Sequence, residues 1–476
     1  MPHPWAAVTL LAALAAPSGA TPPVEAPGLK PHASGWSRDR RLSFDPGASE
    51  LPYNFARPIA ADGRGGVHVV WQDSRSGVPQ VLGRRSLDGG VTWGPELRLS
   101  RRSLPAGNPA VAAAGGAVYA AWHGLRDGSL GILFRRSLDR GATWSREAAL
   151  AFPPTGAANP AIAAAAGRLH VVWADRRHGQ AEVYTRRSTD GGVTWEPEQL
   201  LSEVPYESWV PTVEAAGEAV YVAWVDYRDG NEEEYFRRST DGGATWEPAV
   251  RLTRDAADSW APSLAVAGRT VHAVWFDRRA AGATDAEVEA QLNRALTLLG
   301  LPASPPPTRD PAVYYLPLFE QRLQDKVQQV QAAAPGWVQR GGDPEALEAL
   351  LVRFEDLFRR WASGWEIFAK DSPDGGETWG PDRRLTFAPG ASARPSLAAA
   401  GDELHLTWFD GRDGAFEIYT KASSDGGATW GPDLRLTRSL ADARHPSIAL
   451  SRRHVHVVWF DRRAGNDEIY TKRKRR

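Results

Sequence analysis

The side chains best suited to bind a ligand lie just before a proline that recurs along the chain. The residue directly before this proline is, in chain order, Arg57, Asn108, Asn159, Val210, Ala261, Arg394 and His445. One position earlier, three repeats carry residue types common in binding sites, namely Trp209, Trp260 and Arg444. Guanidinium groups bind carboxylates through paired hydrogen bonds, and indole rings stack on the apolar face of a sugar. The pattern therefore predicts recognition of an acidic, sugar-like ligand.

The elements that position these residues belong to a repeat of 51 residues. Successive tryptophans from Trp71 to Trp275 are 51 residues apart, and so are Trp408 and Trp459. The gap between Trp275 and Trp408 is 133 residues, which exceeds one period by 82. Alternating apolar segments and Gly-rich turns make each unit a four-stranded propeller blade. In the sixth unit we expect strands at residues 395–400, 404–408, 417–421 and 430–437.

A second marker, Ser-x-Asp-x-Gly-x-Thr-Trp, follows the first six of these tryptophans, from Ser86–Trp93 to Ser423–Trp430. Its aspartate can accept N–H groups of its own turn, and its glycine supplies a positive φ. Fourteen of the 20 tryptophans occupy the two repeat positions, counting Trp36. We therefore expect them in the core rather than at a ligand.

The seventh unit ends before its fourth strand, and the N-terminal segment supplies a match for it. Trp36 and Arg40–Ser43 have the spacing of Trp379 and Arg383–Thr386. We expect this segment to complete blade seven and close the ring, which leaves no exposed sheet edge. The predicted fold is all-β, a seven-bladed β-propeller over residues 35–476 with a three-helix insert at 283–364 in blade five.

The innermost strand of each blade carries the proline, so the residues before it are expected to ring the mouth of the channel. Blades six, seven and one bring together Arg394, Arg444, His445 and Arg57. Blades four and five bring together Trp209 and Trp260, with Tyr206 and Glu207 close by. Asn108 and Asn159 lie between these two sectors. The alternative is that the arginines pair with Asp or Glu of adjacent loops and the tryptophans pack beneath the insert.

Residues found in almost every blade are more simply structural. An Asp-x-Arg pair such as Asp175 and Arg177 follows the first tryptophan in six units, and we expect a loop salt bridge there. One strand position holds His68, His170, His272, His405 and His456. These histidines are a blade apart, so no metal site is expected from them, and no cofactor is predicted. The sequence assigns no catalytic residue.

The six boxes resemble those of the sialidase (neuraminidase) superfamily, the bacterial Asp-box or BNR-repeat propellers, over residues 36–476 apart from the insert. The resemblance implies a propeller whose boxes lie opposite the active site. It also implies three arginines on the substrate carboxylate, a Tyr–Glu pair as nucleophile and an Asp as acid/base. Catalytic sialidase domains have six blades, and Phe55–Ile59 matches their Phe-Arg-Ile-Pro motif only loosely. Arg57 is the one residue that the resemblance assigns, to the substrate carboxylate.

The insert contains three amphipathic helical patterns. Their apolar faces carry Val288, Leu292, Leu296 and Leu299; Leu316, Phe319, Leu323, Val327 and Val330; and Leu347, Leu350, Leu351, Phe354, Leu357, Phe358 and Trp361. Asp343 and Pro344 are a typical N-cap and first helical residue for the third helix. The insert is either a bundle that decorates the rim or a lid or partner platform.

Composition and the N-terminus bear on location and partners. A net charge of -1 gives no basic face for nucleic acid, and the absence of cysteine excludes disulfides and thiolate metal sites. Residues 1–20 read as a signal peptide and 21–34 as a Pro-rich linker, so we expect a secreted or periplasmic protein. No later run is long and apolar enough to predict a membrane span.

Two functions follow from these observations. The first is an exported sialidase-like propeller that binds an anionic glycan at the channel mouth and can hydrolyse it as an exo-glycosidase. The second is a non-catalytic scaffold that binds protein or glycan through residues 283–364. The superfamily repeat favours the first, whereas the seven blades and the absent arginine motif favour the second.

Overall fold

The computed structural model describes residues 35–44, 47–52, 56–101, 104–203, 205–255, 257–279, 285–302, 316–439 and 441–476. The predicted signal peptide and linker lie outside these residues. The described chain forms two compact units, a β unit within Val24–Asp277 and Glu366–Arg476 and a helical unit at Arg278–Trp365. Among the described residues, no helix has the length and apolar character needed to cross a membrane.

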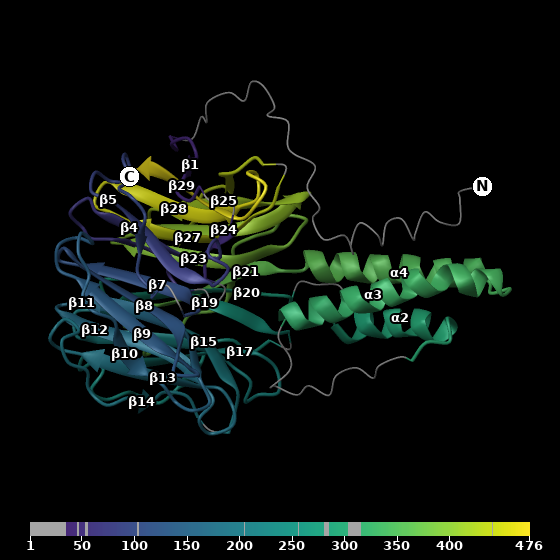
Figure 1. The fold of residues 1–476 in the computed structure, drawn as a ribbon, viewed down its shortest axis with the longest axis horizontal. Coiled ribbons are helices and arrows are strands. Elements are labelled where there is room, and N and C mark those ends of the chain that lie inside the picture. The colour runs from purple at the N-terminus through teal and green to yellow at the C-terminus, as the bar shows by residue number, and fades with distance from the viewer. Residues whose placement is uncertain are drawn as a thin grey trace. The chain divides into compact units, whose positions relative to one another are not determined.

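The β unit contains seven antiparallel sheets (Figure 1). Blade one contains β2 (Ser49–Glu50), β3 (Ile59–Ala61), β4 (Val67–Asp73), β5 (Gln80–Ser86) and β6 (Leu97–Arg98). Blade two contains β7 (Ala106–Ala114), β8 (Ala117–Arg126), β9 (Ser129–Ser137) and β10 (Ala148–Ala151). Blade three contains β11 (Ala157–Ala165), β12 (Arg168–Asp175), β13 (Glu182–Ser188) and β14 (Gln199–Leu200).

The remaining four sheets repeat this pattern. Blade four contains β15 (Ser208–Ala216), β16 (Ala219–Asp226), β17 (Glu233–Ser239) and β18 (Val250–Arg251). Blade five contains β19 (Ser259–Ala267), β20 (Thr270–Asp277), β21 (Glu366–Ser372) and β22 (Arg383–Arg384). Blade six contains β23 (Ser392–Ala400), β24 (Glu403–Asp413), β25 (Ala415–Ser423) and β26 (Leu434–Arg435). Blade seven contains β27 (Ala443–Leu450), β28 (His454–Asp461), β29 (Glu468–Arg475) and β1 (Arg40–Arg41).

The inner strands contact one another in the order β3, β7, β11, β15, β19, β23, β27 and back to β3. This closed order confirms the seven-bladed propeller. The predicted fourth strand of blade six was too long, because β26 comprises only Leu434–Arg435 instead of residues 430–437. Pro432 has no N–H to donate, so regular pairing begins only after it.

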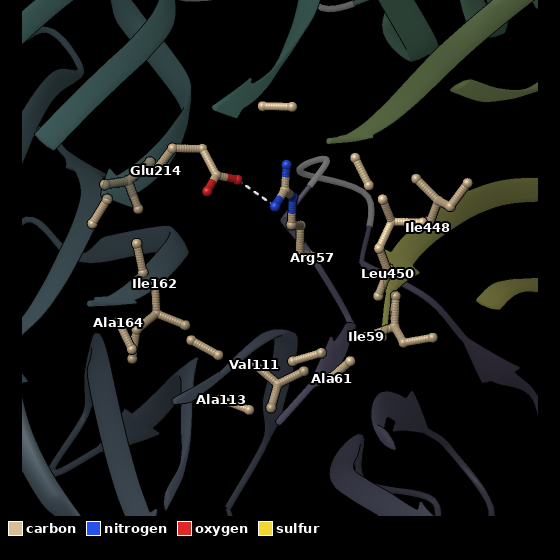
Figure 2. A pocket seen from close by; sticks show the side chains of 18 of the residues that line it. Arg57, Ile59, Ala61, Val111, Ala113, Ile162, Ala164, Glu214, Ile448 and Leu450 are labelled. Carbon is tan, nitrogen blue, oxygen red and sulfur yellow. Dashed lines mark ion pairs between the residues drawn. The ribbon is translucent and has the colours of Figure 1, made fainter. Parts of the chain in front are cut away.

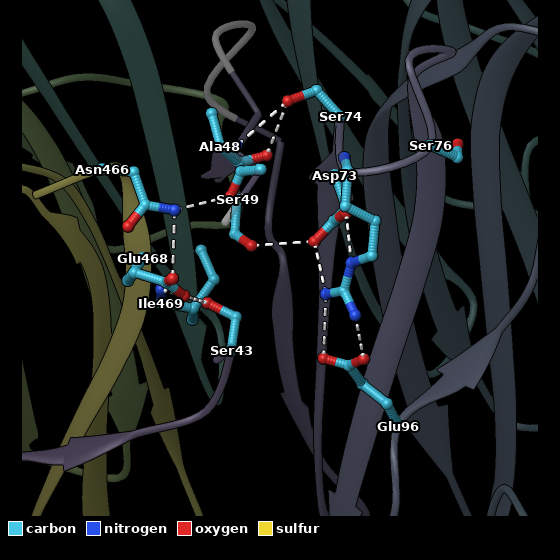
Figure 3. A network of polar contacts seen from close by, with 12 residues as sticks. Ser43, Ala48, Ser49, Asp73, Ser74, Ser76, Glu96, Asn466, Glu468 and Ile469 are labelled. Atoms are coloured by element: carbon cyan, nitrogen blue, oxygen red, sulfur yellow. Dashed lines mark hydrogen bonds and ion pairs between the residues drawn. The ribbon is translucent and has the colours of Figure 1, made fainter. Parts of the chain in front are cut away.

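The N-terminal segment closes the ring at blade seven, as predicted. Arg40 and Arg41 of β1 pair with Thr471 and Tyr470 of β29. The buried carboxylate of Glu468 accepts a hydrogen bond from the hydroxyl of Ser43 (Figure 3). It also accepts one from the guanidinium of Arg41. Ring closure therefore rests on a strand pair and on a buried carboxylate whose partners are more than 400 residues away in sequence.

Each Asp box folds as a turn closed by its own side chains. In the first box, Asp88 accepts hydrogen bonds from the backbone N–H and the hydroxyl of Thr92, at 2.8 and 2.6 Å. Ser86 accepts the N–H of Gly90 at 2.8 Å. These bonds hold the pKa of Asp88 at about 2, well below its ordinary value. The box is thus a structural device, and it stays charged at neutral pH.

Three of the repeated histidines, His68, His170 and His456, pack against a glycine in the box of the following blade. His170 is buried, and a Cβ built on Gly243 of the next box would lie 3.0 Å from its ring. Burial lowers the pKa of His68 and of His170 to about 4, so both rings are neutral at pH 7. Among the described residues, no group of three or more His, Asp or Glu side chains is arranged to hold a metal ion.

The insert lies between β20 and β21 and forms three helices, α2 (Asp285–Leu298), α3 (Leu316–Gln339) and α4 (Pro344–Ser363). Their apolar faces form one core that includes Leu292, Val327 and Leu351. Asp343 caps α4 by accepting the N–H of Glu345 at 3.0 Å, as predicted. The helical unit therefore has a hydrophobic core of its own.

Deleting residues 35–44 is expected to destabilise the propeller, because blade seven loses its outer strand together with the fully buried Leu42. The single change Leu42→Ala should cost about 2–5 kcal/mol of unfolding free energy. The matched control is Leu138→Ala, at a side chain that is 70% exposed, which should cost less than about 0.5 kcal/mol. Thermal denaturation measures all three, and an unchanged melting temperature for the truncated chain would contradict closure.

Candidate functional site

The residues that precede the repeated proline sit at a β-bulge. In six blades the register between strands one and two shifts at this point. The bulged residues all have positive φ, and they are Asn108, Asn159, Val210, Ala261, Arg394 and His445. A positive φ is rare for a β-branched residue such as Val210, which has φ of 50°. The bulge re-aims these side chains, and Asn108 donates to Asn159 of the next blade at 3.0 Å.

Arg57 reaches across the propeller from blade one. Its guanidinium forms an ion pair with Glu214 of β15 in blade four (Figure 2). Its Nη2 also donates to the backbone carbonyls of Leu264 in β19 and Leu397 in β23, the latter at 3.0 Å. One side chain thus contacts three blades other than its own.

The Arg57–Glu214 pair lies in the wall of a cavity of about 220 Å³. The lining comes from the inner strands of all seven blades, and its other side chains are Ala, Val, Ile and Leu. Figure 2 shows Ile59, Val111 and Ile162 around this space. Within the part of the chain that the structure describes, the Arg57–Glu214 pair is therefore the one charged feature of the cavity lining.

The three predicted arginines do not share one partner. Arg444 pairs with Asp442 at 2.8 Å, and its guanidinium lies 4.5 Å from the centre of the Phe416 ring. Arg57 is already paired with Glu214. Arg444 therefore pairs with an acidic residue of its own loop, as the alternative predicted, whereas the partner of Arg57 lies on an inner strand three blades away rather than in an adjacent loop. A common carboxylate site formed by Arg57, Arg394 and Arg444 is not what these contacts show.

Arg394 and His445 lie together in the same sector. Both line a small cavity between strand one of blades six and seven and the segment that leads into β3, with Leu51 and Pro58 on its other side. His445 is 9% exposed, and its ring packs edge-on against Phe460. Burial, together with the positive charges of Arg394 and Arg444, holds the pKa of His445 well below its usual value. This histidine is therefore neutral at pH 7.

Trp209 and Trp260 come together as the sequence predicted. Their ring centres are 5.8 Å apart with 42° between the planes. Trp260 is buried, whereas Trp209 is partly exposed. A partly exposed indole is a surface on which a sugar ring can stack.

Tyr206 and Glu207 have different surroundings. Tyr206 is 42% exposed, and Glu207 is buried. Glu207 pairs with Arg176 at 2.5 Å and accepts the N–H of Ala181 in blade three at 2.7 Å. Asp258 and Asp442 accept the equivalent N–H in the next blades, so this role repeats. Burial raises the pKa of Glu207, although the positive charge of Arg176 acts in the opposite direction. Both contacts of Glu207 join blade four to blade three, so they are structural.

Two carboxyl groups were not predicted from the sequence, although each replaces a residue that is apolar in every other blade. Glu214 stands where every other blade has alanine, and Glu234 stands where every other blade has valine or isoleucine. Glu234 is 1% exposed, and neither of its carboxyl oxygens has a hydrogen-bond partner among the described residues. Burial, and the charges of Glu233 and Asp277, raise its pKa well above its ordinary value. Buried carboxyls of this kind are more common at functional sites than in structural cores.

These features define a BNR-type β-propeller with a polar channel mouth. Residues 26–272, more than half of the chain, match the family model described as a BNR repeat-like domain. The chain therefore belongs to the BNR repeat-like domain family, as the boxes indicated. Comparison with curated protein sequences found no match.

Several solved structures are similar in fold. The α-L-arabinofuranosidase of Fusarium graminearum is 14% identical with a TM-score of 0.41, covering 75% of this chain and 89% of its own. Trypanosoma rangeli sialidase is 9% identical with a TM-score of 0.43, covering 80% of this chain and 56% of its own. The endosialidase of phage phi92 is 10% identical with a TM-score of 0.45, covering 92% of this chain and 69% of its own.

Replacing Glu234 by the aliphatic residue of the other blades tests whether its carboxyl group lowers the unfolding free energy. Glu234→Ile should raise the unfolding free energy by about 1–3 kcal/mol, because a buried group without a hydrogen bond is removed. Because the folded state holds the proton more tightly than the unfolded chain, wild-type stability falls as pH rises, and the variant should lose this slope. Thermal melts over a pH series measure both effects.

The adjacent glutamate gives the matched control. Glu233 is bonded to Arg251 and Thr253, so Glu233→Gln should destabilise the protein. A loss of stability in Glu234→Ile would show that the carboxyl has a structural role.

Proposed function

We propose that this chain is an exported propeller that binds an anionic glycan at the mouth of its channel. The observation that carries the proposal is the guanidinium of Arg57, which lies at the channel among strands of four blades. The composition of residues 1–20 supports export, and membership of the BNR repeat-like family agrees with a function on glycans.

The contacts of Arg57 connect it to the aromatic pair. Strand β15 supplies both Trp209 and Glu214, and β19 supplies both Trp260 and Leu264. The two strands that carry the indoles therefore also carry two of the groups that hold the guanidinium. Glu214 lies five residues beyond Trp209 along β15. A glycan of more than one sugar can therefore stack on Trp209 and direct a carboxylate into the channel, where a planar guanidinium matches its geometry.

Positive charge on the other side of the mouth adds to this site. Arg394 lies beside His445 in the sector of blades six and seven. Asn108 and Asn159 offer amide groups between the two sectors. The mouth thus combines an aromatic surface, fixed cations and neutral hydrogen-bonding groups, which suits an acidic sugar better than a neutral one.

We further propose that the protein hydrolyses the glycan that it binds. Incubation with a fluorogenic sialoside tests this activity. Arg57 and Arg444 have separate carboxylate partners, so the proposal here is for binding first. Release of the fluorophore, and its loss in the Arg57→Ala variant, would establish an exo-sialidase. Folded protein that binds the glycan without turnover from acidic to neutral pH would establish a binding protein.

The second candidate, a scaffold that acts through the insert, is favoured by the separate core of the helical unit. Replacing residues 283–364 by a short Gly-Ser linker separates the two candidates. Glycan binding at the channel mouth should survive this deletion. Loss of glycan binding with the propeller still folded would favour the insert as the binding element.

Removing the guanidinium should weaken binding of an acidic sugar. The comparison is made in a Glu214→Ala background, so that no buried carboxylate loses its partner. There Arg57→Ala should cost about 1.5–3 kcal/mol, roughly a 10- to 150-fold rise in Kd for sialic acid measured by titration calorimetry. Binding of neutral sugars and the melting temperature should hardly change.

The control is Arg177→Ala, a repeated loop arginine that pairs with Asp175 and Glu198 away from the channel. It should lower stability slightly and leave the affinity unchanged. Equal losses of affinity at Arg177 and Arg57 would refute a specific role for Arg57.

A further inference from the structure

The ion pair across the channel departs from the repeat at both of its ends. The position of Glu214 is alanine in the other six blades, at Ala60, Ala112, Ala163, Ala265, Ala398 and Ala449. Arg57 occupies the position before the repeated proline, where most blades carry a shorter side chain. A ring of seven near-identical blades would fold without this pair, so its presence calls for another explanation.

The guanidinium is held in place without the help of Glu214. Its Nη2 donates to the carbonyls of Leu264 and Leu397, which belong to the fixed inner strands of blades five and six. Its Nη1 faces Glu214. If Glu214 moved away, Arg57 would keep its two backbone bonds and present Nη1 to another anion.

Glu214, in contrast, depends on Arg57 for its charge. Burial raises the pKa of the Glu214 carboxyl, and Arg57 acts in the opposite direction. Among the described residues, no other titratable side chain lines the cavity, and the cross-strand neighbour of Glu214 is Tyr221. Tyr221 is buried, and burial raises its pKa above the ordinary value for tyrosine, so it stays neutral. A Glu214 carboxylate that lost Arg57 would take up a proton rather than remain charged.

We infer that Glu214 is an internal substitute for the carboxylate of the ligand. It occupies Nη1 of Arg57 until a ligand carboxylate takes its place, and the released Glu214 then binds one proton from solvent. The inference rests on the proposed function, since it names how the same site is regulated. Charge balances in this exchange, because one carboxylate enters the ion pair while the other is neutralised by the proton.

The exchange makes ligand binding depend on pH. One proton is taken up for each ligand bound, so affinity should rise as pH falls, by up to about tenfold per pH unit. This pH dependence holds in the pH range where Glu214 is charged in the free protein and protonated in the complex with the ligand. A rigid arginine site without exchange would show no such slope from this group.

Titration calorimetry of the full mature chain with sialic acid and with glucuronic acid tests the inference. Wild type should take up close to one proton, measured in buffers with different ionisation enthalpies. Glu214→Ala restores the residue of the other blades, so it should fold. It should bind about tenfold more tightly at neutral pH, without proton uptake or pH dependence. Glu214→Gln provides a second variant of similar size with the same expectation.

Glu96→Gln is the matched control, because Glu96 also pairs with an arginine, Arg75, but lies away from the channel. It should keep the wild-type affinity and proton uptake. Binding by wild type with uptake and pH dependence unchanged in Glu214→Ala would overturn the exchange while leaving the proposed function intact. No binding of either acid by wild type or by Glu214→Ala would overturn the proposed function and the exchange together.

Discussion

In six of the seven blades, a buried aspartate two residues after the repeated tryptophan joins the strands of the blade to a loop. In blade four, Asp226 accepts the indole N–H of Trp224 at 2.9 Å, the hydroxyl of Ser208 at 2.9 Å, and the Nε of Arg228 at 2.9 Å. Arg228 in turn lies 4.1 Å from the centre of the Tyr235 ring. One carboxylate thus joins strands one and two to the mouth loop, and losing one partner of such a buried pair costs about 3–5 kcal/mol.

This repeated aspartate also shows which charged residues belong to one blade only. Asp73, Asp175, Asp410 and Asp461 make the same arginine pair, so the repeat already satisfies its own buried charges. Arg57 and Glu214 satisfy each other outside this scheme, and Glu234 is not satisfied at all among the described residues. These three residues are thus departures from the repeat that the blade scheme itself does not require.

Much of the fold could be predicted from the sequence, because the repeat shows the same local chemistry several times. The 51-residue period, the closure by Arg40 and Arg41, and the cap at Asp343 each depend on short-range patterns or on exact spacing. The pairing of Trp209 with Trp260 followed from their equivalent positions in neighbouring blades. The partners of Arg57 could not be predicted, because its side chain crosses the ring and meets groups 157, 207 and 340 residues away. Glu214 could have been found by comparing strand one across all blades, since it replaces an otherwise constant alanine.

The decisive measurement is a crystal structure of the wild-type propeller with bound sialic acid. We expect the carboxylate of the sugar within hydrogen-bond distance of Nη1 of Arg57, and Glu214 turned away from the guanidinium. A sugar bound elsewhere, or one bound at the mouth while Glu214 still pairs with Arg57, would contradict this expectation.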